Sequence, residues 1–223
     1  MFIINKQATR VYSKIRHRRG HGIHSPFVFS FVTNIVENKH AFYAYSDIET
    51  YLSERRKKKY KSKKINKLIF QIILFYKKNN ILEIGSGKDY NALYASAISQ
   101  QVKMTCVETR TSLRKQLSTL LYDWKHPISL QETLPQTAEK FDCILVDFKR
   151  YSDNPEVLCD YLFAHSNENT VIILNNIRTN PSVYSLVQQI RKDQRVRISL
   201  DMYQTAVFFF DTKYYKRNYL LSF

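Results

Sequence analysis

Two glycines and two glutamates stand where an alternating strand and helix pattern would bind a ligand. Gly85 and Gly87 lie in ILEIGSGKDYNALYAS, between a short apolar run and a helical stretch. Glycine permits a sharp turn and lets a ligand approach the backbone. Glu83 precedes both glycines, and Glu108 ends the next apolar run, VKMTCVE, 25 residues later. A carboxylate there can accept both hydroxyls of a ribose. The pattern predicts a nucleoside site, while the glycines alone would also fit a plain tight turn.

Acidic residues near the predicted strand ends discriminate between two classes of nucleoside ligand. Glu83, Asp89 and Asp147 all lie at or just beyond the ends of apolar runs. The pyrophosphate of a dinucleotide would be repelled by these charges, whereas a sulfonium and an ammonium would be attracted. The charges therefore favour S-adenosylmethionine over a dinucleotide.

From Ile65 onward, the elements that must position these residues alternate between strands and helices. Apolar, often β-branched runs predict strands at ILEI, VKMTCVE, ISLQ, DCILVD, TVIILN, VRISLD and TAVFFF. This alternation is typical of a parallel sheet covered on both faces. Residues 202–204 alone separate the last two runs, which must therefore pair antiparallel. We predict an α/β fold: a Rossmann-like, seven-stranded, mostly parallel, doubly wound sheet ending in an antiparallel hairpin.

The N-terminal part of the chain differs from the rest in charge. The 223 residues carry a formal net charge of +16, and residues 1–64 contribute 15 Lys or Arg against 4 Asp or Glu, which is +11. The other 159 residues contribute only +5. We therefore predict a basic helical N-terminal extension over 1–64 and the ligand-binding α/β domain over 65–223.

Two helix starts and a polybasic run are visible in this extension. Ser25 before Pro26 provides a hydroxyl cap with proline at the first helical position. Ser46 with Glu49 three residues later has the pattern of a capping box. Arg55 to Lys64, RRKKKYKSKK, then has eight basic residues in ten. Such a run is either a solvated, self-repelling stretch or a surface for nucleic acid or another polyanion, and both interpretations stay open.

Cysteine usage and hydropathy indicate the compartment. No apolar run approaches the ~20 residues of a membrane span, and the first twenty residues are charged throughout, unlike a secretory signal. Cys106, Cys143 and Cys159 show no CxxC spacing. We expect a cytoplasmic protein with reduced cysteines, no structural zinc and no transmembrane segment.

The motifs resemble those of class I S-adenosylmethionine-dependent methyltransferases. ILEIGSG, VKMTCVE, FDCILVD and TVIILNN look like the successive cofactor motifs of that family, over roughly residues 65 to 210. The order of acidic residues most resembles the O-methyltransferase branch. GHGIHSPFVFSFV with FYAYSDIE resembles the leader of a methyltransferase-like family typical of Bacteroidetes. The resemblance implies methyl transfer from S-adenosylmethionine to an oxygen or nitrogen of an unidentified acceptor.

The same resemblance implies roles for individual residues of the cofactor site. The methionine end of the cofactor would contact Glu83, Gly85, Gly87, Tyr90 and Asn91. The ribose would be held by Glu108, and the adenine would lie near Gln131 and Glu132. Asp147 would face the cofactor amine or the acceptor.

Two residues are candidates for catalysis, and three residues depart from the family pattern. Asp147 is a catalytic candidate or a cap of the following turn, and His24 is a candidate base or a local hydrogen-bonding residue. Asn175 and Asn176 stand where metal-dependent relatives carry an acidic pair, and amides offer only neutral oxygens, so we expect no tightly bound metal. Asp89 stands where relatives often have glycine. These departures leave open a degenerate methyltransferase-fold protein without catalysis. The basic N-terminal segment leaves open a second alternative, a basic nucleic-acid-binding protein.

Overall fold

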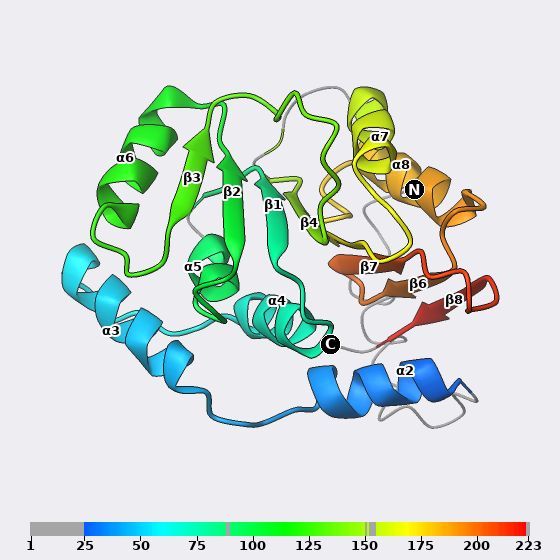
Figure 1. The fold of residues 1–223 in the computed structure, drawn as a ribbon, viewed down its shortest axis with the longest axis horizontal. Helices are drawn as coiled ribbons and strands as arrows, with labels where there is room; N and C mark the ends of the chain where they lie inside the picture. Colours follow the sequence, from blue (N-terminus) through cyan, green and yellow to red (C-terminus); the bar gives the residue numbers. More distant parts are fainter. Residues whose placement is uncertain (1–24, 88–89, 150, 152–154, 222–223) are drawn as a thin grey trace.

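The computed structural model describes residues 25–87, 90–149, 151 and 155–221, and eight strands of this part form one sheet in the order β3-β2-β1-β4-β5-β7-β6-β8 (Figure 1). The strands are β1 (Asn80–Ile84), β2 (Lys103–Val107), β3 (Ile128–Gln131), β4 (Cys143–Asp147), β5 (Val171–Asn175), β6 (Ile198–Asp201), β7 (Thr205–Phe209) and β8 (Arg217–Leu220). The first five pair parallel with one another, while β7 is antiparallel to both β5 and β6. The predicted doubly wound sheet with its terminal hairpin is confirmed.

β8 is an eighth strand that the sequence did not reveal. It pairs parallel with β6, with Ile198 opposite Arg217. Its sequence, RNYL, contains no run of apolar residues, and most of its side chains are exposed. Because an edge strand buries little, it lacks the hydrophobic signal that identified the other seven strands.

Side chains of the central strands alternate between two cores, as the pleat requires. Ile81 and Leu145 face one core, which includes residues of α4 (Lys64–Phe75) and α5 (Asn91–Ser96). Leu82 and Ile144 face the other, which includes residues of α7 (Pro155–Ala164) and α8 (Pro181–Lys192). Helix α6 (Thr111–Leu121) follows β2 and contacts β3. The central strands β1, β4 and β5 are buried on both faces, which explains their continuous apolar sequences.

The helix predicted after Ser25 is confirmed as α2 (Pro26–Phe31), where the Ser25 hydroxyl accepts a hydrogen bond from the Val28 amide at 3.5 Å. A π-helical segment, η2 (Val32–Val36), continues it. Phe31 and Ile35 are buried in the same core as the sheet residues, next to α4. The first described part of the extension therefore packs directly on the α/β domain.

The helix start predicted at Ser46 is wrong, because α3 (Tyr43–Arg56) begins three residues earlier, after Phe42. The Ser46 hydroxyl donates to the Tyr43 carbonyl at 2.8 Å, inside the first turn. Glu49 instead accepts hydrogen bonds from the amide and the hydroxyl of Ser62. Helix α3 packs on α4 and α5 through a separate cluster that contains Ile48, and burying such a side chain stabilises the fold by about 1.5–3 kcal/mol.

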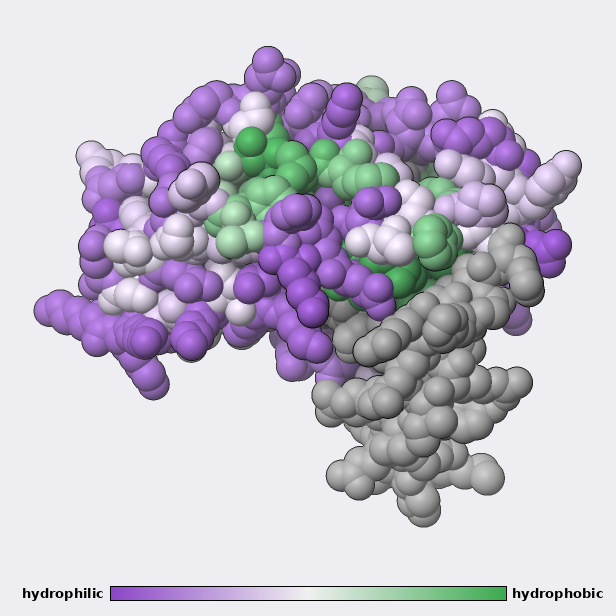
Figure 2. All heavy atoms as spheres, turned by 90° about the horizontal axis from the view of Figure 1, so that it is seen from below, coloured by the Kyte–Doolittle hydropathy of each residue, from purple (hydrophilic) through white to green (hydrophobic). Residues whose placement is uncertain are grey.

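The lower face of the molecule, seen in Figure 2, carries hydrophobic residues in its middle and hydrophilic residues around them. Large apolar side chains are exposed on α2 and on the end of α4, namely Phe29, Leu74 and Phe75. Within the described ranges, no helix combines the length and the apolar character needed to cross a membrane.

Candidate functional site

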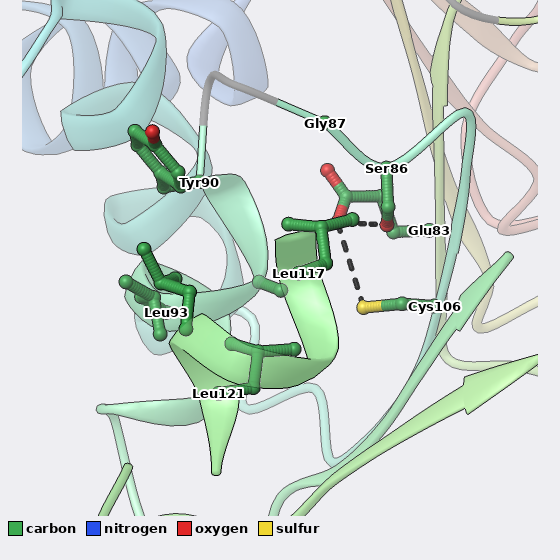
Figure 3. A pocket seen from close by; sticks show the side chains of 10 residues that line it. Glu83, Ser86, Gly87, Tyr90, Leu93, Cys106, Leu117 and Leu121 are labelled. Carbon is green, nitrogen blue, oxygen red and sulfur yellow. Dashed lines mark hydrogen bonds between the residues drawn. The ribbon is translucent and has the colours of Figure 1, made fainter. Parts of the chain in front are cut away.

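The loop after β1 is hydrogen-bonded to the neighbouring strand β2, and the Glu83 side chain of β1 lies beside a small cavity. Gly85 has a φ of 79°, a left-handed conformation that favours glycine. The amides of Gly85 and Ser86 both donate to the Val107 carbonyl, at 3.0 and 3.1 Å. The buried Glu83 carboxylate accepts from the Ser86 hydroxyl at 2.6 Å and from the Cys106 thiol at 3.6 Å (Figure 3). The sequence motif thus forms a tight turn around a buried carboxylate.

Burial raises the pKa of Glu83 to about 7, and the charge of Asp147 acts in the same direction. Hydrogen bonds from Ser86, Asn91 and Cys106 oppose this shift without overcoming it. Glu83 therefore changes its charge close to neutral pH. A cationic group placed beside it would favour the ionised carboxylate.

Polar and apolar residues line the cavity together. The polar side is formed by Glu83, Ser86, Gly87 and Tyr90, from the end of β1, the loop after it and the residue before α5. The other lining residues are Ala92, Leu93, Cys106, Leu117, Leu120 and Leu121. Figure 3 shows the leucines of α6 lying between the Glu83 side and the Tyr90 side. The pocket therefore joins the end of β1, the start of α5 and helix α6.

A buried chain of amides connects this pocket to the polybasic run. Asn91 donates to Glu83 at 3.2 Å and accepts from the fully buried Asn66 of α4 at 2.8 Å. Asn66 in turn accepts from the Lys63 amide at 2.9 Å and from the Tyr60 hydroxyl at 3.3 Å. Asn66 was missed in the sequence, where the one available signal is a small polar residue in the otherwise apolar INKLIFQIILF.

The carboxylate at the end of β2 is held by a cation of its own chain. Glu108 is 1% exposed and forms a bidentate ion pair with Arg110, at 2.7 Å for both contacts. Its amide donates to the Gln131 carbonyl at 3.0 Å, so these two predicted residues are adjacent. Glu132 is exposed and pairs with Arg114 at 3.0 Å. Arg110 was also missed, although an arginine two residues after a site carboxylate is visible in VETR.

The ends of β4 and β5 carry one carboxylate among amides. Asp147 is buried, and its Oδ1 accepts from the Asn176 side chain at 2.6 Å and from the Lys149 amide at 2.9 Å. Asn175 accepts from the Thr205 hydroxyl at 3.2 Å. Across the part of the chain that the structure describes, no three His, Cys, Asp or Glu side chains group as metal ligands would.

The structure thus gathers most of the predicted site residues along one edge of the sheet. Glu83, Gly87 and Tyr90 line one pocket, with Gly85 in its loop and Asn91 hydrogen-bonded to Glu83. Glu108 and Gln131 stand at the ends of the neighbouring strands β2 and β3, and Asp147 ends β4, on the other side of β1. His24 and Asp89 lie outside the described residues.

Solved structures share this architecture. A methyltransferase from Podospora anserina with bound SAH matches at a TM-score of 0.58 and 13% identity, over 84% of this chain and 97% of that one. An O-methyltransferase from Bacillus cereus in complex with SAH matches at 0.57 and 14%, over 82% and 97%. The chain has a methyltransferase fold.

The O-methyltransferase TomG from Streptomyces achromogenes, in complex with SAM, has the same methyltransferase fold, with a TM-score of 0.52 and 14% identity over 86% of this chain and 98% of that one. No family model matches the sequence, and no curated protein matches it. At these identities the likeness shows the fold, so the activity has to be argued from the site itself.

Proposed function

We propose that the chain is an S-adenosylmethionine-dependent methyltransferase, cytoplasmic as its three buried free cysteines suggest, acting on an acceptor oxygen or nitrogen. The observation that carries this is the pair of buried carboxylates, Glu83 and Glu108, at the ends of adjacent parallel strands on either side of the Gly85 turn. Parallel α/β sheets bind ligands at this edge. The related folds that were crystallised with SAM or SAH support the assignment.

The residues of the pocket fit the parts of this cofactor by their chemistry. Glu83, with its raised pKa, becomes a good partner for the ammonium or sulfonium when it ionises. The Gly85–Gly87 turn places no side chain larger than that of Ser86 at the approach. The leucines of α6 supply apolar surface next to it. The bound cofactor would supply a methyl group already activated on a sulfonium, so the protein's tasks are alignment and exclusion of water.

The acceptor would approach from the β4 and β5 side. Asp147 is buried there and is the catalytic candidate, because its carboxylate could take a proton from the acceptor or hold it in place. Asn176 fixes one of its oxygens through the 2.6 Å hydrogen bond. The exposed Lys149 follows two residues later, and His24 remains a second proposed base.

Isothermal titration calorimetry with S-adenosylmethionine and with SAH tests the proposal. We expect binding in the micromolar to low millimolar range, lost on Glu83→Leu, which removes the charge from the pocket. The exposed Glu168→Gln, in the loop before β5, is the matched control, expected to bind like the wild type. If the wild-type protein and this control both fail to bind at millimolar ligand, the chain is a degenerate member of the fold.

A second candidate function, polyanion binding through Arg55 to Lys64, is favoured by where the structure places this run. It spans the end of α3, a loop, and the start of α4. The Tyr60 ring packs on the Tyr90 ring at 5.7 Å between centroids, and Arg56 lies over both rings at 5.6 and 5.7 Å. Exposed lysines therefore stand next to the proposed cofactor pocket, where a nucleic-acid acceptor would be recruited. On this proposal the helical extension, 1–64, serves the α/β domain, 65–223.

Salt-dependent binding of the full chain to a single-stranded RNA oligonucleotide tests this candidate. Replacing Lys57, Lys58, Lys59 and Lys61 by Ser keeps the Arg55–Asp123 ion pair and the Arg56 and Tyr60 contacts. Each lost phosphate contact should reduce the slope of log K against log salt by about 0.7. The matched control replaces four exposed lysines elsewhere, Lys39, Lys103, Lys115 and Lys192. Equal loss in both variants would indicate a solvated run without a specific role.

A further inference from the structure

The carboxylate proposed to hold the ribose is already engaged by the side chain and backbone of Arg110. Oε1 of Glu108 accepts from the Arg110 amide at 2.9 Å and from its Nε at 2.7 Å, and Oε2 accepts from Nη2 at 2.7 Å. A carboxylate offers about four acceptor positions. Three of the four are taken by one residue, and both positions on Oε1 are filled.

A ribose that donates one hydroxyl to each oxygen needs a position on Oε1, which is available only if the guanidinium leaves. Resting on the function proposed above, we propose that Arg110 competes with the cofactor ribose for Glu108 and so sets the affinity of the site. Binding of the ribose and release of the Arg110 side chain are then one event. The apparent affinity is lowered by the fraction of molecules in which Arg110 is engaged.

The geometry allows this exchange without unfolding any element. The Arg110 side chain is 37% exposed, whereas that of Glu108 is 1% exposed, so the guanidinium can rotate into solvent while the carboxylate stays in place. Arg110 is the N-cap residue of α6, and its side chain caps no helix amide. The hydrogen bond from its backbone amide to Oε1 survives the rotation, and the position vacated by Nε becomes free for a ribose hydroxyl.

The neighbouring Arg114 provides a matched comparison. It lies on the same helix, carries the same charge and contacts the same residue, but through the Glu108 carbonyl at 3.0 Å. Its other partners are the Thr109 carbonyl at 3.3 Å and Glu132, so none of its contacts is to the Glu108 carboxylate. Removing Arg114 therefore lowers the positive charge near the site while leaving the acceptor positions of Glu108 as they are.

The experiment measures the affinity of the full chain for SAH and for adenosine, which carries the ribose without the charged groups. Arg110→Ala should tighten binding of both ligands by about 3- to 10-fold, the gain expected if Arg110 is engaged in about 70 to 90% of free molecules. Arg114→Ala should leave adenosine affinity within about twofold. Arg110→Lys, which cannot form the bidentate pair, should fall between wild type and Arg110→Ala. Thermal unfolding of each variant shows that it is folded.

The outcomes separate this inference from the proposed function. Binding that is equal or weaker in folded Arg110→Ala overturns the competition and leaves the methyltransferase proposal intact. Tightening by Arg114→Ala to the same extent also overturns it, because a general charge effect would then be responsible. If wild type, Arg110→Ala and Arg110→Lys all fail to bind S-adenosylmethionine and SAH at millimolar concentration, the proposed function fails, and this inference with it.

Discussion

The two halves of the sheet's carboxyl edge hold their carboxylates in different ways. At β1 and β2, Glu83 lies buried among neutral donors with its pKa raised to about 7, and Glu108 is neutralised by Arg110. At β4 and β5, Asp147 is bound by the Asn176 amide, and Asn175 stands beside it on the next strand. The first half holds two buried carboxylates that a cation and a ribose would use. The second has one charge among amides, an arrangement that suits positioning an acceptor better than holding a metal ion.

The largest expected effect comes from removing the ribose ligand in the first half. In the Arg110→Ala background, Glu108→Ala should weaken SAH binding by about tenfold to 150-fold, because two charge-assisted hydrogen bonds worth roughly 1.5 to 3 kcal/mol are lost. In the wild-type background the loss should be smaller, because there the ribose first displaces Arg110. Calorimetry on the four proteins of this cycle measures the difference. Equal losses of affinity in both backgrounds would contradict the proposal that Arg110 competes with the ribose for Glu108.

The next effect concerns the second half and is read in turnover. Asp147→Asn should lower methyl transfer at least about tenfold, because the remaining carboxylate of that half is lost while shape and most hydrogen bonds are kept. Transfer of radiolabelled methyl groups to cell extract measures it, with cofactor affinity measured in parallel. Asp160→Asn, an exposed acid on α7, is the control and should behave like the wild type. Undiminished turnover in Asp147→Asn would show that this carboxylate only caps its turn and takes no part in methyl transfer.

A smaller effect is expected from pH, acting on the first half through Glu83. Its pKa of about 7 means that the carboxylate is mostly neutral at pH 6 and mostly ionised at pH 8. If the ionised form binds the cofactor cation, affinity should rise over this interval by up to about tenfold. Glu83→Gln should lose that rise, so the difference between the two proteins isolates Glu83 from the titration of the ligand's own amine. A wild-type profile parallel to that of Glu83→Gln would contradict the role of Glu83.

The free protein should show the opposite trend in stability. The folded-state pKa of Glu83 lies above the ordinary value of 4.5, so the native state binds more protons than the unfolded state between these values. The stability contributed by this group therefore falls as the pH rises from 4.5 through 7. Relative to Glu83→Gln, the melting temperature of the wild type should decrease between pH 5 and pH 8, and saturating SAH should reduce that decrease.

The same contrast explains how far the sequence could predict this molecule. Strands of the core were predictable because burial on both faces leaves long apolar runs, and the residues at their ends followed from the strand positions. β8 escaped because an edge strand needs no such run. The start of α3 was misplaced because packing decided it: the Phe42 ring lies 5.0 Å from the Phe70 ring and 5.4 Å from the Tyr45 ring. These ring contacts place the start of α3 at Tyr43, three residues before Ser46, where the capping-box pattern predicted it.

Partners of the site residues were harder to predict than the site residues themselves. The carboxylates Glu83 and Glu108 could be found from spacing, since a motif fixes which residue ends a strand. Arg110 and Asn66 could not, because their roles depend on a side-chain rotamer and on a contact 25 residues apart in sequence, between Asn66 and Asn91. The polarity of a residue is visible in the sequence, whereas its partner is decided by the fold.

Removing or adding divalent cations is expected to have no effect on methyl transfer, because the second half offers a metal ion few ligands. A divalent cation there would find one carboxylate, Asp147, whose Oδ1 already accepts from the Asn176 amide and the Lys149 amide. Mg²⁺ bound by one charge and neutral amide oxygens would keep most of its waters and bind weakly. EDTA should therefore leave methyl transfer unchanged, and added Mg²⁺ should not raise it. Asn175→Asp with Asn176→Asp supplies the missing carboxylates and is the sharper test: only this double variant should bind Mn²⁺ in calorimetry. Wild-type activity that vanishes with EDTA and returns with Mg²⁺ would place the chain with the metal-dependent O-methyltransferases. The two halves of the edge would then differ because the second half binds a metal ion.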